Sequence, residues 1–196
     1  MESKIQHDEL ATCQYYLSKA KAHLVKQKHT ESLHVVQLGL QKFPNELSLL
    51  LTAFDICQSS GDFDCCIQYA RQLIDRHPTN WEGYVFAARS FLALKKRNQA
   101  KEVILSGLLV LPEDFQMLLI ACRVLEASAD FTDALECAQR VIALHPKKWQ
   151  GYYWAAKVCF SNGSYESAER HVNFALSLKQ DPVSYTHLTL PTIYSV

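Results

Sequence analysis

The chain contains 196 residues, and its 20 lysines and arginines balance its 20 aspartates and glutamates, so the formal net charge at pH 7 is +0. A chain without net positive charge has no global field that attracts nucleic acid or anionic lipid. The first ten residues contain neither the apolar core of a signal peptide nor a run long enough to span a bilayer. We therefore expect a cytoplasmic protein that binds neither nucleic acid nor membranes.

Prolines recur along the chain at one fixed interval. Successive members of the series Pro44, Pro78, Pro112 and Pro146 are 34 residues apart. A fixed period of this length indicates a stack of supersecondary units, none of which can bury its apolar face alone. Because proline cannot continue a helix, each of the four is expected to end the second helix of a unit and direct the chain into the next unit.

Five repeating units follow from this spacing, after a lead-in at residues 1–12. The predicted units are residues 13–46, 47–80, 81–114, 115–148 and 149–182. In each first helix a large residue precedes a mostly small pair, and in each second helix a mostly small residue precedes an apolar one by four positions. This spacing predicts helical faces rather than strands. Turns between the helices are predicted at Gly61, Ala129 and Gly163.

The pattern of large-x-x-small-small, then small, aliphatic and terminal proline resembles the tetratricopeptide repeat (TPR) over residues 13–182. The resemblance implies an all-α fold, a right-handed superhelical solenoid of about five helix-turn-helix hairpins. It also implies a protein–protein interaction scaffold whose first helices line a concave groove. The first unit departs from the pattern because Lys19 and His23 replace apolar residues, which suits the exposed polar end of a stack.

A longer period lies over the short one. The motif His-Pro-x-x-Trp-x-Gly-Tyr begins at His77 and again at His145, 68 residues later, and Gly39 and Gly107 obey the same offset. The building block is therefore expected to be a pair of hairpins, with interfaces that alternate along the stack. This pattern resembles repeat regions of bacterial proteins that precede sulfotransferase or glycosyltransferase domains. An alternative function is thus the N-terminal repeat region of a larger transferase whose catalytic domain is absent from this chain.

Residues 183–196 break every periodicity and shift to Thr, Ser and β-branched residues. The segment resembles the translated read-through of a sequencing adapter, and we interpret it as artefactual rather than native sequence. A genuine flexible tail is the alternative. In either case the segment is set apart from the fold.

The ninth position of each unit falls on the first helix, away from the small-residue packing face. It holds four cations and one acid: Lys21, Asp55, Arg89, Arg123 and Lys157. Aromatic candidates on the same helices are Phe86, Tyr153 and Trp154. If these residues share the inner surface, they predict a basic groove with aromatic platforms for a protein or extended acidic peptide, or for a sulfated or sugar-bearing ligand. The alternative is that the cations only solvate the inner helices while the rings pack between units.

Sequence motifs for catalysis or metal binding are absent. The chain has no GxSxG, HExxH, glycine-rich phosphate loop or paired-cysteine zinc motif. Its seven cysteines are odd in number, so we expect neither a disulfide framework nor a structural zinc site. His77 and His145 are interpreted as structural caps of helix-terminal carbonyls. We accordingly expect no enzyme activity, no cofactor and no metal.

Overall fold

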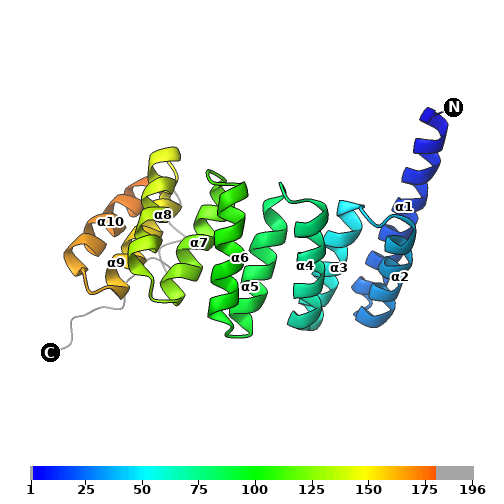
Figure 1. Ribbon diagram of the computed structural model, residues 1–196, viewed down its shortest axis with the longest axis horizontal. Helices are drawn as coiled ribbons and strands as arrows, with labels where there is room; N and C mark the ends of the chain where they lie inside the picture. Colours follow the sequence, from blue (N-terminus) through cyan, green and yellow to red (C-terminus); the bar gives the residue numbers. More distant parts are fainter. Residues whose placement is uncertain (1, 180–196) are drawn as a thin grey trace. The chain divides into compact units, whose positions relative to one another are not determined.

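The computed structural model describes residues 2–179, with side chains from residue 13 onward, and each regular element in this range is an α-helix (Figure 1). In chain order the helices are α1 (Glu2–Val25), α2 (His29–Lys42), α3 (Leu47–Ser60), α4 (Phe63–Arg76), α5 (Trp81–Ala93), α6 (Arg97–Val110), α7 (Phe115–Ala127), α8 (Phe131–Leu144), α9 (Trp149–Ser161) and α10 (Tyr165–Leu178). The all-α class predicted from the sequence is confirmed. The predicted tail at 183–196 lies outside the described residues.

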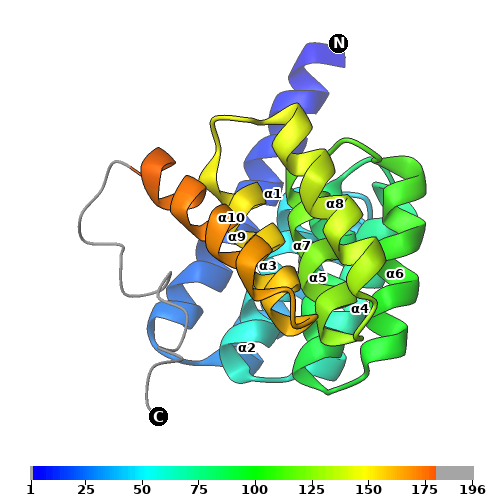
Figure 2. The ribbon, with the colours of Figure 1, turned by 90° about the vertical axis from the view of Figure 1, so that its left-hand side faces the viewer.

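The chain forms two compact units that divide between Lys96 and Arg97. Unit 1 contains α1 to α5, where each helix packs on the next and α1 also contacts α3. Unit 2 contains α6 to α10, where each helix again packs on the next and α7 also contacts α9. Figure 2 shows α9 and α10 side by side as a hairpin. In both units, therefore, first helices of successive repeats contact one another.

Each connection from a first helix to a second helix contains one left-handed residue. The described non-proline residues with positive φ recur every 34 positions, at Gln27, Gly61, Lys95, Ala129 and Gly163. Just after each of them a backbone N–H donates to a carbonyl five residues back, as from Asp62 to Cys57 at 3.0 Å. This bond is the signature of a Schellman motif, which ends a helix and redirects the chain. The three predicted turns are confirmed, whereas Gln27 and Lys95 were missed because neither residue type favours positive φ.

The periodic prolines mark helix ends as predicted. Two residues before each proline a second helix ends, at Lys42, Arg76, Val110 and Leu144. The intervening residue has left the helical region, with φ of −125° and ψ of 69° at Phe43 and φ of −133° and ψ of 62° at His77. The proline ring disfavours helical geometry in the residue before it, which explains this common ending.

The two histidines before prolines do not cap their own helices. The Nε2 atom of His77 lies 2.9 Å from the carbonyl oxygen of Asn45, in the loop that follows α2. The ring of His145 packs edge-on against Phe115 at the start of α7, with centroids 5.0 Å apart. The interpretation as caps of terminal carbonyls is therefore corrected, because both side chains contact the segment that follows the preceding repeat's second helix.

Some helices approach closely where a glycine faces a neighbouring helix. A Cβ atom on Gly83 would lie 3.0 Å from the backbone nitrogen of Ile74, and one on Gly151 would lie 3.1 Å from that of Ile142. These glycines are on the first helices α5 and α9 and face α4 and α8. At the α2–α3 interface the glycine is on the second helix, where a Cβ on Gly39 would lie 3.1 Å from a leucine side chain of α3. These interfaces alternate, as the 68-residue offset predicts.

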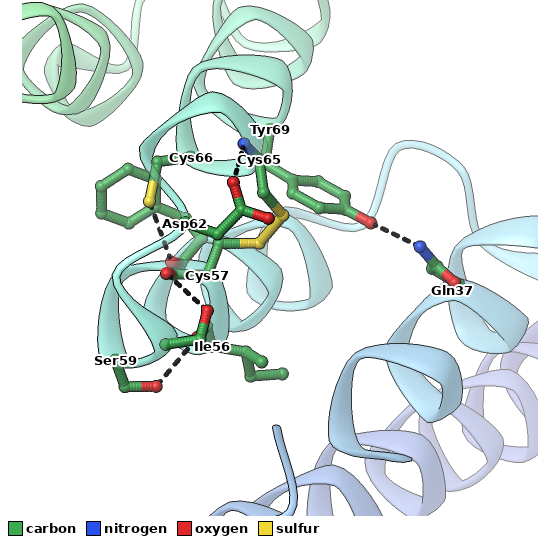
Figure 3. Close-up of a disulfide and its surroundings, with 10 residues drawn as sticks. Gln37, Ile56, Cys57, Ser59, Asp62, Cys65, Cys66 and Tyr69 are labelled. Atoms are coloured by element: carbon green, nitrogen blue, oxygen red, sulfur yellow. Dashed lines mark hydrogen bonds between the residues drawn. A yellow bond between two sulfur atoms is a disulfide. The ribbon is translucent and has the colours of Figure 1, made fainter. Parts of the chain in front are cut away.

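One cysteine pair is joined across the turn between α3 and α4. The sulfur atoms of Cys57 and Cys65 are 1.96 Å apart and the Cα atoms are 5.7 Å apart (Figure 3). The expectation of no disulfide is wrong for this pair, because the left-handed turn brings the last turn of α3 beside the first turn of α4. The other cysteines are free and buried: Cys13, Cys66, Cys122, Cys137 and Cys159. Burial raises the pKa of Cys66 and of Cys137 to about 11, so both remain thiols near neutral pH.

The recurring left-handed turn predicts opposite effects for two substitutions. Gly163→Ala puts a Cβ into open space but forces alanine to a φ near 78°, and should lower the free energy of unfolding by about 1 kcal/mol. Ala129→Gly removes the same conformational cost and should raise it by up to about 1 kcal/mol. Urea unfolding followed by circular dichroism measures both changes. Changes of the same sign in the two variants would contradict the argument.

The glycine contact of α9 with α8 predicts that a single methyl group is destabilising there. Gly151→Ala would place a Cβ 2.9 Å from Ile142 Cγ1 and 3.1 Å from the Ile142 backbone nitrogen. We expect the free energy of unfolding to fall by about 1–3 kcal/mol, although alanine is the better helix former. Thermal melting tests this, and an unchanged or higher melting temperature would show that the interface has room for the methyl group.

Candidate functional site

The ninth-position residues lie at accessible places on the first helices. Four of the side chains are exposed and Lys157 is partly buried; the exposed ones are Lys21, Asp55, Arg89 and Arg123. The residues that precede Arg89 and Lys157, Ala88 and Ala156, are at most 2% exposed. The small residues thus occupy the packing face, and the charges lie outside it. Lys21, Asp55 and Arg89 belong to unit 1, and Arg123 and Lys157 belong to unit 2.

The first-helix surface of unit 1 is mixed in charge. Burial and the carboxylate of Glu82 raise the pKa of Asp55, and the ammonium group of Lys21 partly opposes this shift. These three groups come from α1, α3 and α5 and influence one another electrostatically. An anionic partner would meet two carboxylates here beside the cation of Lys21, which makes unit 1 a weak acceptor for acidic ligands.

In unit 2 the Lys157 side chain is held by contacts from two helices. Its Nζ atom lies 3.3 Å from Oε2 of Glu126 on α7, whose side chain is only 16% exposed. The hydroxyl of Ser161 donates to the other oxygen of Glu126 at 2.8 Å. The same Nζ lies 4.8 Å from the ring centroid of Trp154. Lys157 is therefore positioned between a carboxylate and an indole ring rather than extended into solvent.

Aromatic rings continue from Trp154 along α9. The ring of Tyr153 meets Trp154 edge-on at 5.6 Å and Trp149 edge-on at 5.8 Å. We call Trp149, Tyr153 and Trp154 the α9 aromatic row. Its far end is also covered by a cation, because Nζ of Lys179 lies 4.4 Å from the Trp149 centroid. The row and its lysines form one continuous cation–aromatic surface, to which two of the predicted site residues, Tyr153 and Trp154, belong.

Phe86 belongs to a different environment. Its ring stacks on Phe54 of α3 with centroids 4.0 Å apart and an interplanar angle of 7°. Phe54 is 2% exposed, so one face of the Phe86 ring packs on a buried residue. This arrangement agrees with the alternative in which aromatic residues pack between repeats. Phe86 keeps a partly exposed edge but is not an open platform.

Several participants were missed by sequence reasoning. Glu126, Trp149 and Lys179 each contact the predicted site residues or the aromatic row. Glu126 is 31 positions before Lys157, one repeat minus one helical turn, so the period itself could have suggested this contact. Lys179 follows α10, and no local pattern connects it with the start of α9. Its contact depends on how the two antiparallel helices of the hairpin are aligned.

The described residues offer neither a metal site nor a membrane span. Side chains in this part of the chain contain no group of three His, Cys, Asp or Glu residues that could hold a metal ion. Among the described helices none is both long and apolar enough to cross a membrane.

Comparison with known proteins supports the repeat assignment. The family model of the tetratricopeptide repeat matches residues 123–182, which include most of α7 and all of α8 to α10. No curated protein matches the chain in sequence.

Solved structures resemble the chain in fold. A crystal structure of MamA protein has a TM-score of 0.70 and 14% sequence identity, and the match covers 92% of this chain and 98% of that one. A MamA fragment, residues 41 to the end, from Desulfovibrio magneticus RS-1 has a TM-score of 0.70 at 13% identity, covering 88% and 97% of the two chains. TTC0263, a thermophilic TPR protein in Thermus thermophilus, has a TM-score of 0.66 at 16% identity, covering 90% and 96%. At these identities the likeness shows the fold, a TPR-type helical repeat.

The shifted carboxyl of Asp55 predicts a pH-dependent stabilisation. A folded-state pKa above the ordinary value means that ionisation of Asp55 opposes folding, so its cost is present at neutral pH and disappears as pH falls. Asp55→Asn should therefore be more stable than the parent at about pH 7, with the difference shrinking towards about pH 3.5. Urea unfolding at several pH values measures this difference. Glu82→Gln is the matched variant, and it should change stability in the same direction because it removes the neighbouring negative charge.

Proposed function

We propose that the chain is a protein-interaction scaffold that binds an extended acidic peptide on the first-helix surface of unit 2. The observation that carries this proposal is the cation–aromatic surface of α9, next to the exposed guanidinium of Arg123 on α7. Cations and half-buried rings on adjacent helices suit carboxylates that alternate with apolar side chains along an extended peptide.

The lysines favour a peptide over a glycan. A sugar ring binds by stacking on an open aromatic face, but Lys157 lies over the Trp154 ring and Lys179 lies over the Trp149 ring. A glycan would have to displace these ammonium groups. An acidic peptide could instead pair with them where they are, which makes it the better match to the same surface.

The alternative as the repeat region of a larger transferase rests on the two Trp-x-Gly-Tyr motifs. In the structure these tryptophans begin α5 and α9, and the glycines face the preceding helix at the distances given above. The motif thus has a packing role within this chain that is independent of any catalytic domain. The peptide-binding scaffold is the function that the surface chemistry favours.

Charge reversal on the first helices tests the proposal. Arg89→Glu combined with Arg123→Glu should weaken the binding of a fluorescein-labelled Asp/Glu-rich peptide by about tenfold at low salt, measured by fluorescence anisotropy. The affinity of the parent should fall with added salt, and that of the variant less so.

The matched control reverses two exposed cations on second helices. Arg97→Glu with Arg170→Glu changes the net charge by the same amount, so it should reproduce only the non-specific part of the loss. Equal losses in the two double variants would mean that the peptide responds to overall charge and not to the first-helix surface. Trp154→Ala should also weaken binding without changing net charge.

A further inference from the structure

Unit 2 contains a cleft away from the cation–aromatic surface. It has a volume of about 380 Å³ and is lined by α8, the end of α9 and the turn into α10. Its apolar lining includes Leu135, Val158 and Cys159. Polar groups converge on the same space: the carboxylate of Glu136, the amides of Gln139 and Asn162, and the hydroxyls of Thr132 and Ser164. Glu136 is the one charged residue among those lining it.

The corresponding place in unit 1 is occupied by the chain itself. Shifting Gln139 and Cys159 back by the 68-residue offset gives Arg71 and Phe91. There the guanidinium carbon of Arg71 lies 5.8 Å from the ring centroid of Phe91, which is 2% exposed. Unit 2 therefore lacks both the ring and the cation that occupy this position in unit 1.

The neighbouring substitutions follow the same trend. In unit 1 Nζ of Lys96 lies 3.7 Å from the carboxylate of Asp64. Their counterparts in unit 2 are Ser164 and Thr132, and neither carries charge. Glu136 replaces Gln68, so the unit 2 cleft has lost both cations of its counterpart but still holds one carboxylate. The charge of its lining is complementary to a cation.

We propose that this cleft binds an arginine side chain of a protein partner. The methylene stem packs on Leu135 and Val158, and the guanidinium takes the place that Arg71 has in unit 1, beside Glu136. The amide oxygens of Gln139 and Asn162 and the two hydroxyls are available acceptors for a planar group with five N–H donors. The binding surface is distinct from that proposed for acidic peptides, since Arg123, Lys157 and the α9 aromatic row do not line the cleft.

Arg170 of α10 is the nearby cation that could compete for this place. Burial raises the pKa of Cys159 and Arg170 opposes that shift, so the two side chains interact electrostatically. Arg170 does not line the cleft, and its Nη2 atom lies 3.2 Å from the hydroxyl oxygen of Ser167 within α10. The cleft thus stays available to an arginine from outside the chain.

The test uses the tripeptide acetyl-Gly-Arg-Gly-amide and nitrogen-15 NMR spectra of the full chain. Shifts should concentrate on the amides of residues 131–139 and 158–164, with a dissociation constant of the order of 1 mM for a single side chain. The citrulline tripeptide, which has nearly the same shape without the charge, should bind at least threefold more weakly, as should the arginine peptide to Glu136→Gln.

Two variants rebuild the unit 1 arrangement within unit 2. Gln139→Arg supplies an internal guanidinium from an exposed position, and Cys159→Phe supplies the missing ring; each should abolish the localised shifts. Because Cys159 is buried, the Gln139→Arg variant decides the outcome if Cys159→Phe fails to fold. Equal binding of arginine and citrulline peptides, undiminished shifts in Gln139→Arg, or no localised shifts at about 20 mM peptide would overturn the proposal. None of these variants alters Arg89, Arg123 or the α9 aromatic row, so the outcome is separate from the acidic-peptide test.

Discussion

One left-handed residue between the two helices of each repeat determines where the side chains of this chain meet. Because it recurs every 34 residues, corresponding positions return to corresponding places on successive helices. Lys157 reaches Glu126 of the previous repeat for this reason, and Cys57 reaches Cys65 across a single turn. The charged ninth position stays outside the packing face in every repeat for the same reason. A change of one residue in turn length would rotate each of these side chains to another face of its helix.

The close helix contacts alternate over two repeats, and this longer period gives the chain two different kinds of interface. Gly83 and Gly151 let a first helix lie close to the second helix before it, whereas Gly39 does the same from the second helix. Duplicated pairs of hairpins can then diverge at side chains without altering the backbone contacts. The position of Phe91 in unit 1 and of Cys159 in unit 2 is such a difference, and a filled space in one pair corresponds to a cleft in the other.

The two proposed binding surfaces of unit 2 are opposite in charge. The first-helix surface presents cations close to aromatic rings, while the cleft on α8 presents a single carboxylate beside amides and hydroxyls. The balance of charge in the whole chain conceals this separation. A partner with an acidic stretch and an arginine could therefore use both surfaces, and each contact would contribute to specificity more than to bulk attraction.

The sequence by itself determined the helices, their ends at the prolines, the 34-residue and 68-residue periods, and the exposed positions of Arg89 and Arg123. These features depend on local spacing, on proline geometry and on the separation of small from charged residues, all of which are written along one helix or turn. Only the tertiary structure decided that Phe86 stacks on Phe54, that His77 contacts the loop at Asn45, and that Lys179 covers Trp149. The cleft beside Glu136 also became visible only there. Such contacts depend on side-chain volumes and on the alignment of helices from different parts of the chain, and periodic spacing does not contain that information.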